Sequence, residues 1–362
     1  MRIISFCKAQ ARSIRLMPAR YPAATLLTPF NDKMRYTDLC SVREPLVSVI
    51  TPSLNHAKFL RATIESVAAQ TFRNFEHIVI DGKSGDGTVE ILKEYPHLNW
   101  TSEPDNGVLD AYQKALRLAR GNYVIQCCVS DGFLAPNWFE KCVELLRREK
   151  DVSLVWALPQ YMSEEGALLG VSYQDLLEDP PPQKEDFLPF WLATKFVLPE
   201  GNYCVRSNVL RENFPDQSAK DHYRIHCHLG FMYNFMTRGY SPLFVPEVVS
   251  YGRLHAGQRG QRLQALERPA FRKYIEDVQL YSKQMFRGEF NHVFRDGTST
   301  VTSEVRELDK GRMRRQYWKY RLLRSRLLRT APYSLLAKLR TKARGMFSSR
   351  TEKQSGPENP SH

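Results

Sequence analysis

The feature that most constrains this chain is a regular alternation of short apolar runs and helical periodicities between residues 46 and 148. Buried strands are indicated by the β-branched and aromatic runs at 46–52, 75–80, 98–102 and 122–129. Apolar residues at helical spacing separate or follow them, at 57–70, 88–95, 108–119 and 137–148. Strands that alternate with helices predict an α/β fold, in which helices cover both faces of a mostly parallel sheet.

Each predicted strand is followed by a polar cluster. These clusters are TPSLN (51–55), DGKSGDG (81–87), SEPDNG (102–107) and SDG (130–132). In open parallel sheets, ligands bind beyond the carboxyl ends of the strands. The four loops are therefore expected to converge on one ligand-binding crevice.

The pattern weakens after Asp151. An acidic, proline-rich stretch at 177–187 predicts a surface loop, and 201–210 predicts a strand followed by a short helix. Further helices are expected over 229–237 and 263–290, with a last strand in PLFVPEVVSY (242–251).

Charge is concentrated near the C-terminal end. The net charge is +13, and residues 310–350 alone hold 14 Lys or Arg and no Asp or Glu. The rest of the chain is close to neutral, which argues against a nucleic-acid-binding core, so no nucleic acid partner is expected. No apolar stretch reaches the ~18 residues that a membrane-spanning helix needs. The 7 cysteines show no CxxC spacing, which favours a reducing compartment without a disulfide framework.

Two long segments carry a family resemblance. They are VSVITPSLNHAKFLRATIESVAAQTFRNFEHIVIDGKSGDGT (47–88) and SEPDNGVLDAYQKAL (102–116). Together they resemble the donor half of a family 2 glycosyltransferase with the Rossmann-like GT-A fold, over 46 to about 140 and more loosely over 200–260. The resemblance implies inverting, hexosyltransferase-type transfer from a nucleoside-diphosphate sugar to a saccharide or lipid-linked acceptor, in surface-glycan biosynthesis.

This resemblance also suggests a division of the chain. Residues 1–45 are expected to be a poorly structured leader, and 46–265 a GT-A domain with a donor-binding half (46–150) and an acceptor half (151–265). A helical extension over 266–308 and a basic amphipathic tail over 309–362, disordered at its end, complete the prediction.

The first predicted donor-binding residues follow the first two strands. By resemblance, Pro52, Ser53 and Asn55 line the base and ribose pocket, and Asp81 accepts a hydrogen bond from a ring N–H of the base. Two structural alternatives stay open. Asn55 is also a suitable residue for the first turn of a helix, and Asp81 for holding its own turn.

Asp105, Asp110 and Lys114 form a second predicted cluster. The resemblance sets this segment against the donor, with Lys114 near the diphosphate, although Gln113 stands where the family usually has asparagine. Asp110 and Lys114 are four residues apart on one helix face, so an intrahelical ion pair is an equal alternative for Lys114.

The metal-binding motif is incomplete. GT-A enzymes carry a DxD-like motif that holds a divalent cation, Mg²⁺ or Mn²⁺, on the donor diphosphate. The matching stretch here is CVSDG (128–132), in which Asp131 is the one carboxylate. By resemblance, His255 is a second metal ligand and Arg253 contacts the donor diphosphate. A structural role is the alternative for His255.

Inverting transfer also needs a base to deprotonate the acceptor hydroxyl. Two alignments with the family's "ED" pair point to Asp221 or to His228. His222 and His226 lie close by, but their spacing matches no metal-site template. The departures at both motifs leave an alternative function open, in which a catalytically degenerate GT-A fold acts as a binding or scaffold module.

The segment from Arg314 to Phe347 interleaves Arg and Lys with Leu, Tyr and Trp. This pattern is typical of an interfacial helix on an anionic membrane surface. A solvated helix and nucleic-acid contact are the alternatives. The expected location is cytoplasmic, peripheral on the inner face of the membrane.

Overall fold

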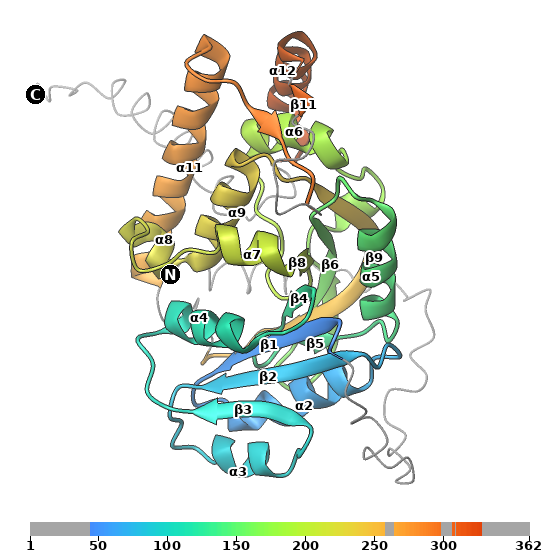
Figure 1. Cartoon of the computed structure of the whole chain (residues 1–362), viewed down its shortest axis with the longest axis vertical. Helices are drawn as coiled ribbons and strands as arrows, with labels where there is room; N and C mark the ends of the chain where they lie inside the picture. The colour runs from blue at the N-terminus through green and yellow to red at the C-terminus, as the bar shows by residue number, and fades with distance from the viewer. Residues whose placement is uncertain (1–43, 258–263, 298–305, 308, 328–362) are drawn as a thin grey trace, which may run out of the picture.

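The predicted alternation of strands and helices is present in the computed structural model (Figure 1), which describes residues 44–257, 264–297, 306–307 and 309–327. The elements of the first half are β1 (Val47–Ser53), α2 (Ala57–Ala68), β2 (Phe75–Asp81), α3 (Thr88–Lys93), β3 (Leu98–Ser102), α4 (Val108–Leu118), β4 (Tyr123–Gln126), β5 (Gly132–Phe133) and α5 (Trp138–Arg148). The fourth strand is shorter than predicted. It ends at Gln126, and Ser130 then adopts a positive φ of 83° that turns the chain.

The second half contributes further strands and helices to the same body. They are β6 (Leu154–Met162), β7 (Leu168–Val171), α6 (Phe187–Thr194), β8 (Cys204–Arg206), α7 (Ser207–Asn213), α8 (Asp221–Ile225), α9 (Cys227–Thr237), β9 (Pro242–Arg253), α11 (Gln264–Arg287), β10 (Val293–Phe294), β11 (Arg306–Glu307) and α12 (Lys310–Leu327). The predicted strand and helix over 201–210 are confirmed as β8 and α7. The loop predicted over 177–187 contains a 3-10 turn (Lys184–Asp186) and ends at the buried Phe187.

One large sheet joins the two halves. Its strand order is β3-β2-β1-β4-β8-β6-β9-β5, and β7 pairs with β6. The first four strands are parallel, as predicted. The second half differs from the prediction of a mostly parallel sheet: β8 runs antiparallel to both β4 and β6, while β6 and β9 are parallel. The sheet is therefore mixed.

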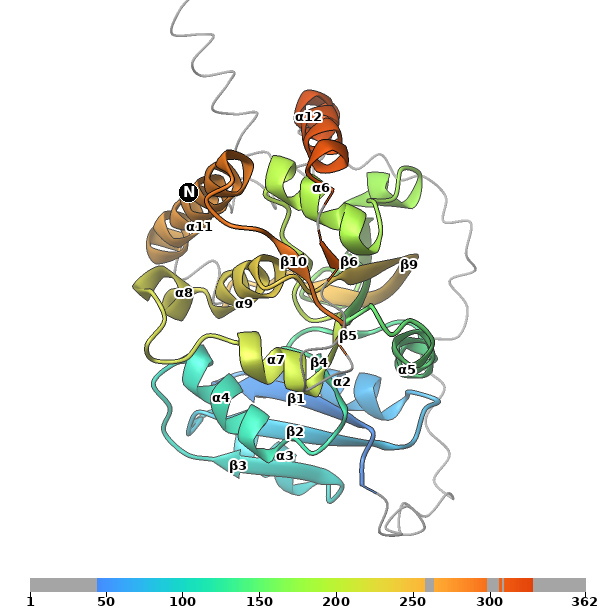
Figure 2. The ribbon, with the colours of Figure 1, turned by 45° about the horizontal axis from the view of Figure 1, so that its top comes forward.

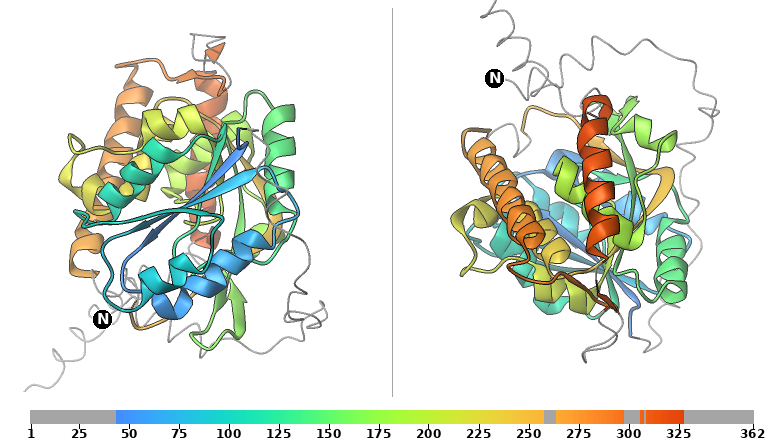
Figure 3. Two further views of the ribbon diagram at one scale, coloured as in Figure 1. Left: turned by 60° about the horizontal axis from the view of Figure 1, so that its bottom comes forward. Right: turned by 90° about the horizontal axis from the view of Figure 1, so that it is seen from above.

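Side chains that alternate along the strands divide the core between the two faces. Val47 and Val49 pack in one cluster with α5, whereas Ile50, Ile78 and Ile80 pack in another with α4 and the helices of the second half. Figure 2 shows α4, α7 and α9 as a layer over one face of the sheet. Figure 3 shows α2 and α3 on the opposite face, with α11 and α12 on the far side of the molecule from them.

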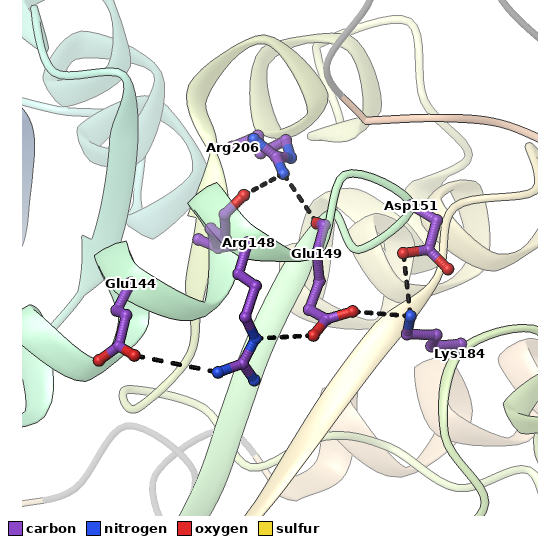
Figure 4. A network of polar contacts seen from close by, with 7 residues as sticks. Glu144, Arg148, Glu149, Asp151, Lys184 and Arg206 are labelled. Atoms are coloured by element: carbon purple, nitrogen blue, oxygen red, sulfur yellow. Dashed lines mark hydrogen bonds and ion pairs between the residues drawn. The ribbon is translucent and has the colours of Figure 1, made fainter.

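A polar network fixes the start of the second half (Figure 4). The Arg206 guanidinium, at the end of β8, donates to the backbone carbonyls of Leu146 and Glu149 at the end of α5. Lys184 pairs with Glu149 at 2.8 Å and with Asp151 at 3.1 Å. The Arg206 contacts thus tie the end of β8 to the end of α5.

Several predictions concern residues outside the described ones. The leader (1–45) lies almost entirely outside them, as do the last 35 residues of the predicted tail. The predicted helix at 263–290 is confirmed by α11. Among the described helices, none has the length and apolar character required to cross a bilayer.

Candidate functional site

Asp81 ends β2 and holds its own loop. Its carboxylate accepts hydrogen bonds from the Ser84 hydroxyl at 2.5 Å and from the Ser84 N–H at 2.9 Å. It also accepts one from the Ser102 hydroxyl, at the end of β3, at 2.6 Å. The Asp81 side chain is fully buried and holds its own loop, which was the structural alternative, while base recognition by Asp81 stays a prediction.

The loops after β1 and β2 are joined to each other. The Asn55 N–H donates to the Ser84 hydroxyl at 2.7 Å, and the Asn55 side-chain oxygen accepts from the Gly85 N–H at 3.0 Å. Asp86 accepts from the Ala57 N–H, which caps the first turn of α2. Pro52 and Ser53 lie at the end of β1, and the buried Ser53 hydroxyl has no hydrogen-bond partner among the described atoms. The loops after the first two strands therefore meet, as the sequence predicts.

The loop after β3 approaches the same place. A side chain at Gly82 would come within 2.6 Å of the Asp105 carboxylate, so the loops after β2 and β3 lie close together here. Lys114 pairs with Glu103 at 2.9 Å and Asp110 at 3.4 Å, and donates to the Pro104 carbonyl. Hydrogen bonding to Glu103 raises the pKa of Lys114. The intrahelical ion pair expected as the alternative is present, and Lys114 holds this loop.

Asp131 is the carboxylate that follows β4, and packing explains why its neighbours are not acidic. Val129 is buried against α2. A side chain at Gly132 would come within 2.5 Å of both the Ser66 hydroxyl and the Tyr251 hydroxyl. The Thr63 hydroxyl donates to the Asp131 carbonyl at 2.7 Å. This close packing against α2 and β9 leaves Asp131 as the one acidic side chain of the stretch.

The end of β9 contacts Asp131. The Arg253 N–H donates to Oδ1 of Asp131 at 3.1 Å, while its guanidinium donates to the carbonyls of Ser163 and Glu164. Burial raises the pKa of Asp131 to about 7, a shift that the Arg253 hydrogen bond opposes. His255 packs against Phe59, with ring centroids 4.6 Å apart, and its buried Nε2 has no hydrogen-bond partner among the described atoms. Burial lowers the pKa of His255.

A cavity of about 300 Å³ opens beside Asp131. Its polar lining includes two carboxylates, Asp131 and Glu200, and two histidines, His226 and His228. Nδ1 of His226 lies 3.7 Å from Oε1 of Glu200. The remaining wall is largely apolar and aromatic, and it includes Phe271 of α11. A pocket that combines few polar groups with an apolar wall is typical of a ligand site.

His228 is buried at the inner wall of this cavity. Its Nε2 donates to the Leu198 carbonyl at 2.8 Å, and its Nδ1 lies 3.3 Å from the Tyr203 hydroxyl. Burial lowers the pKa of His228, so the ring is neutral at pH 7. Of the two residues predicted as the base, His228 is thus at the cavity, with both ring nitrogens in contact with protein atoms.

Asp221 lies elsewhere. It begins α8, its side chain is 84% exposed, and it pairs with Arg224 at 2.5 Å. It is not among the residues that line the cavity. The structure therefore brings Asp131, His228 and Arg253 together and leaves Asp221 apart.

Sequence reasoning missed Glu200, His226 as a cavity residue, and Phe271. Glu200 precedes Gly201, whose positive φ of 84° turns the chain into β8. The Glu-Gly pair before the predicted strand was the one available signal, and it indicates a turn without indicating what the turn faces.

The model of the family described as "Glycosyl transferase family 2" matches residues 48–183. Residues 48–183 are a family 2 glycosyl transferase domain. This matched segment carries the loops after β1, β2 and β3 together with Asp131, whereas Glu200, His228 and Arg253 lie beyond it.

Two curated relatives match the family 2 domain. The chain is 33% identical over 135 residues to the chondroitin synthase of Escherichia coli, covering 36% of this chain and 20% of that protein. It is 41% identical over 115 residues to an uncharacterized glycosyltransferase of Mycobacterium tuberculosis, covering 31% of this chain and 44% of that one. The chain thus spans less than half the length of either relative.

A solved structure supports the fold over a longer part of the chain. The crystal structure of S. aureus TarS 1-349 in complex with UDP-GlcNAc superposes with a TM-score of 0.50 and 16% identity. The match covers 80% of this chain and 75% of that chain. The GT-A-like fold therefore includes more of the chain than residues 48–183, which the family model matches.

Proposed function

We propose that this protein transfers a hexosyl group, with inversion, from a nucleoside-diphosphate sugar to a saccharide or lipid-linked acceptor in surface-glycan biosynthesis. The observation that carries the proposal is the cavity beside Asp131, the carboxylate that follows β4 in a family 2 domain. The names of the similar proteins agree with it, because one is a chondroitin synthase and another was solved with UDP-GlcNAc.

The donor would lie across the loops after β1, β2 and β3. Ser53, Asn55 and Asp105 surround the base and ribose in this proposal, and the buried Ser53 hydroxyl is available to a polar group of the donor. Asp81 and Lys114 act on the donor indirectly, because they hold the loops that contact it. Arg253 acts in the same way through Asp131.

A divalent cation fits this site in one arrangement. Among the described residues, no group of three or more His, Cys, Asp or Glu side chains is arranged to hold a metal ion. Mg²⁺ in nucleotide sites is commonly bound by one or two carboxylates together with substrate phosphates. Asp131 supplies such a carboxylate, with His255 as the second proposed ligand. The cation would offset the charge that develops on the leaving diphosphate.

A second candidate function has its own supporting observation. The Asp81 carboxylate accepts three hydrogen bonds from Ser84 and Ser102, and Gly132 excludes a second carboxylate from the Asp131 stretch. A fold with a weakened donor site would serve as a non-catalytic binding or scaffold module. Turnover separates the two candidates, since both allow nucleotide binding.

The basic C-terminal segment suggests peripheral attachment to an anionic membrane surface, which would bring the site to a lipid-linked acceptor at the cytoplasmic face. Trp318 of α12 is 55% exposed, and Arg321 lies over its ring at 5.4 Å from the centroid. An exposed tryptophan among basic residues is typical of interfacial helices.

Calorimetric titration with UDP and GDP, each with and without Mn²⁺, tests the donor site. The proposal predicts saturable binding of one of them. Turnover is then followed as release of nucleoside diphosphate from a panel of UDP- and GDP-sugars.

A further inference from the structure

The cavity beside Asp131 contains a second carboxylate, Glu200, to which the sequence analysis assigns no role. Glu200 lies on the segment that enters β8, and its carboxylate comes within 3.7 Å of the His226 ring. Its side chain is 48% exposed, so it reaches solvent at the cavity, whereas Asp131 is only partly exposed. A carboxylate that faces both a cavity and solvent can accept a proton from a ligand and pass it to water.

The other candidates for this proton transfer are occupied or distant. His228 donates from Nε2 to the Leu198 carbonyl, and its Nδ1 faces the Tyr203 hydroxyl. Asp221 is exposed, pairs with Arg224 and does not line the cavity. Asp131 accepts the Arg253 N–H with Oδ1 and stands on the donor side of the cavity.

Glu200 and Asp131 approach the cavity from different parts of the chain, which suits one to the acceptor and the other to the donor. Gly201, the next residue, faces Asp131: a side chain there would lie 3.6 Å from Oδ2 of Asp131. Glu200 itself turns toward His226, on the segment between α8 and α9. The two carboxylates therefore approach the cavity from different elements, one from the donor half and one from the second half.

We propose that Glu200 is the general base that deprotonates the acceptor hydroxyl, with His226 positioning its carboxylate. This inference rests on the proposed transferase function. The acceptor O–H proton moves to the Glu200 carboxylate, and the acceptor oxygen forms a bond to C1 of the donor sugar. The bond from C1 to the diphosphate oxygen breaks, its electron pair leaves with the nucleoside diphosphate, and Glu200 later releases the proton to water.

The test compares Glu200→Gln with the wild-type protein. Nucleoside diphosphate release is measured from UDP-glucose, UDP-N-acetylglucosamine, UDP-glucuronate and GDP-mannose, with methyl and octyl glycosides of common hexoses as acceptors. General base catalysis contributes ~10²–10⁴-fold, so the rate of Glu200→Gln should fall at least ~100-fold. Its Kd for UDP or GDP should stay within about threefold of wild type, since the residue acts on the acceptor. Glu200→Asp, which keeps a carboxylate, should retain an intermediate rate.

Glu247→Gln is the matched control, because Glu247 is half exposed, pairs with Lys141 of α5 and is remote from the cavity. Its rate should equal that of wild type, and thermal melting should show that all variants fold. A Glu200→Gln rate within threefold of wild type would overturn the proposal. So would an Asp221→Asn variant that loses turnover while Glu200→Gln remains active. If the wild-type protein binds nucleotide but releases no nucleoside diphosphate from any donor sugar, the proposal for Glu200 is also contradicted. If the wild-type protein binds no nucleotide, the proposed transferase function itself is contradicted.

Discussion

The N–H of Arg253 donates a hydrogen bond of 3.1 Å to Oδ1 of Asp131, and so ties the end of β9 to the loop after β4. These residues are 122 positions apart in the chain. The contact forms because Gly132 lets that loop pack directly between α2 and β9. The position of the proposed donor-binding carboxylate thus depends on a glycine that touches no ligand.

Gly132→Ala tests this dependence. The added methyl group would lie 2.5 Å from the hydroxyls of Ser66 and Tyr251, so the free energy of unfolding should fall by about 1–3 kcal/mol. Gly85→Ala is the matched control, because nothing lies within 4 Å of its added methyl group. Urea denaturation measures both. Equal stability of the two variants would contradict the packing described here.

Acid stability should depend on two buried histidines. Burial lowers the pKa of His77 to about 3 and that of His292 to about 4, against 6.5 for an ordinary histidine. Below pH 6.5 the unfolded chain binds protons that the folded protein does not, so stability is present above that pH and is lost as the pH falls toward 4. The expected loss is about 1.4 kcal/mol per pH unit for each histidine.

His77→Gln and His292→Gln measure this contribution. The readout is the slope of the unfolding free energy between pH 6.5 and 4.5, which should become shallower in each variant whatever its stability at neutral pH. A slope unchanged from wild type in both variants would show that these rings already titrate normally in the folded protein.

Replacing a side chain of α12 by alanine should lower the free energy of unfolding on its buried side and leave it almost unchanged on its exposed side. Met313 is buried where α12 packs on α6, and Met313→Ala should cost about 2 kcal/mol of unfolding free energy. Trp318→Ala, at a 55% exposed position, should change stability by less than about 0.5 kcal/mol. Thermal and urea denaturation measure the stability of both variants. A larger loss in Trp318→Ala than in Met313→Ala would contradict the orientation of α12.

Membrane attachment predicts a charge-dependent interaction. Removing the residues after Leu327 deletes seven Arg or Lys and leaves α12 in place. Each basic residue near an anionic surface contributes about 1 kcal/mol, so sedimentation with phosphatidylserine vesicles should fall sharply at low salt. Phosphatidylcholine vesicles serve as the control. Undiminished binding to anionic vesicles after truncation would exclude this segment as the attachment site.

The sequence predicted the first half of the fold well, for a physical reason. The strands β1 and β2 are buried on both faces, so their runs of β-branched residues are unbroken, and α4 has a clear apolar stripe. The strand β6 and the helix α6 were missed. Pro159 interrupts the strand pattern, and α6 is apolar on nearly every side, so neither shows a clean period.

The residues of the candidate site likewise divide into those that the sequence predicted and those that it did not. Ser53, Asn55, Asp81 and Asp105 were predicted together because they follow adjacent parallel strands, and their loops do meet. Glu200 was not predictable, because its place follows from the antiparallel insertion of β8 between β4 and β6. No local pattern encodes that pairing. Asp221 was favoured by its motif alone, and its exposure is visible only in the structure.

The most direct test of the central claim is calorimetric titration of the wild-type protein and Asp131→Asn with UDP and GDP, with and without Mn²⁺. The asparagine keeps an oxygen for the Arg253 N–H but loses the charge, so the variant should fold. We expect wild type to bind one nucleotide more tightly with Mn²⁺, and Asp131→Asn to bind it about tenfold more weakly than wild type, a loss of ~1.4 kcal/mol. Absence of nucleotide binding by the wild-type protein, with or without Mn²⁺, would contradict the account.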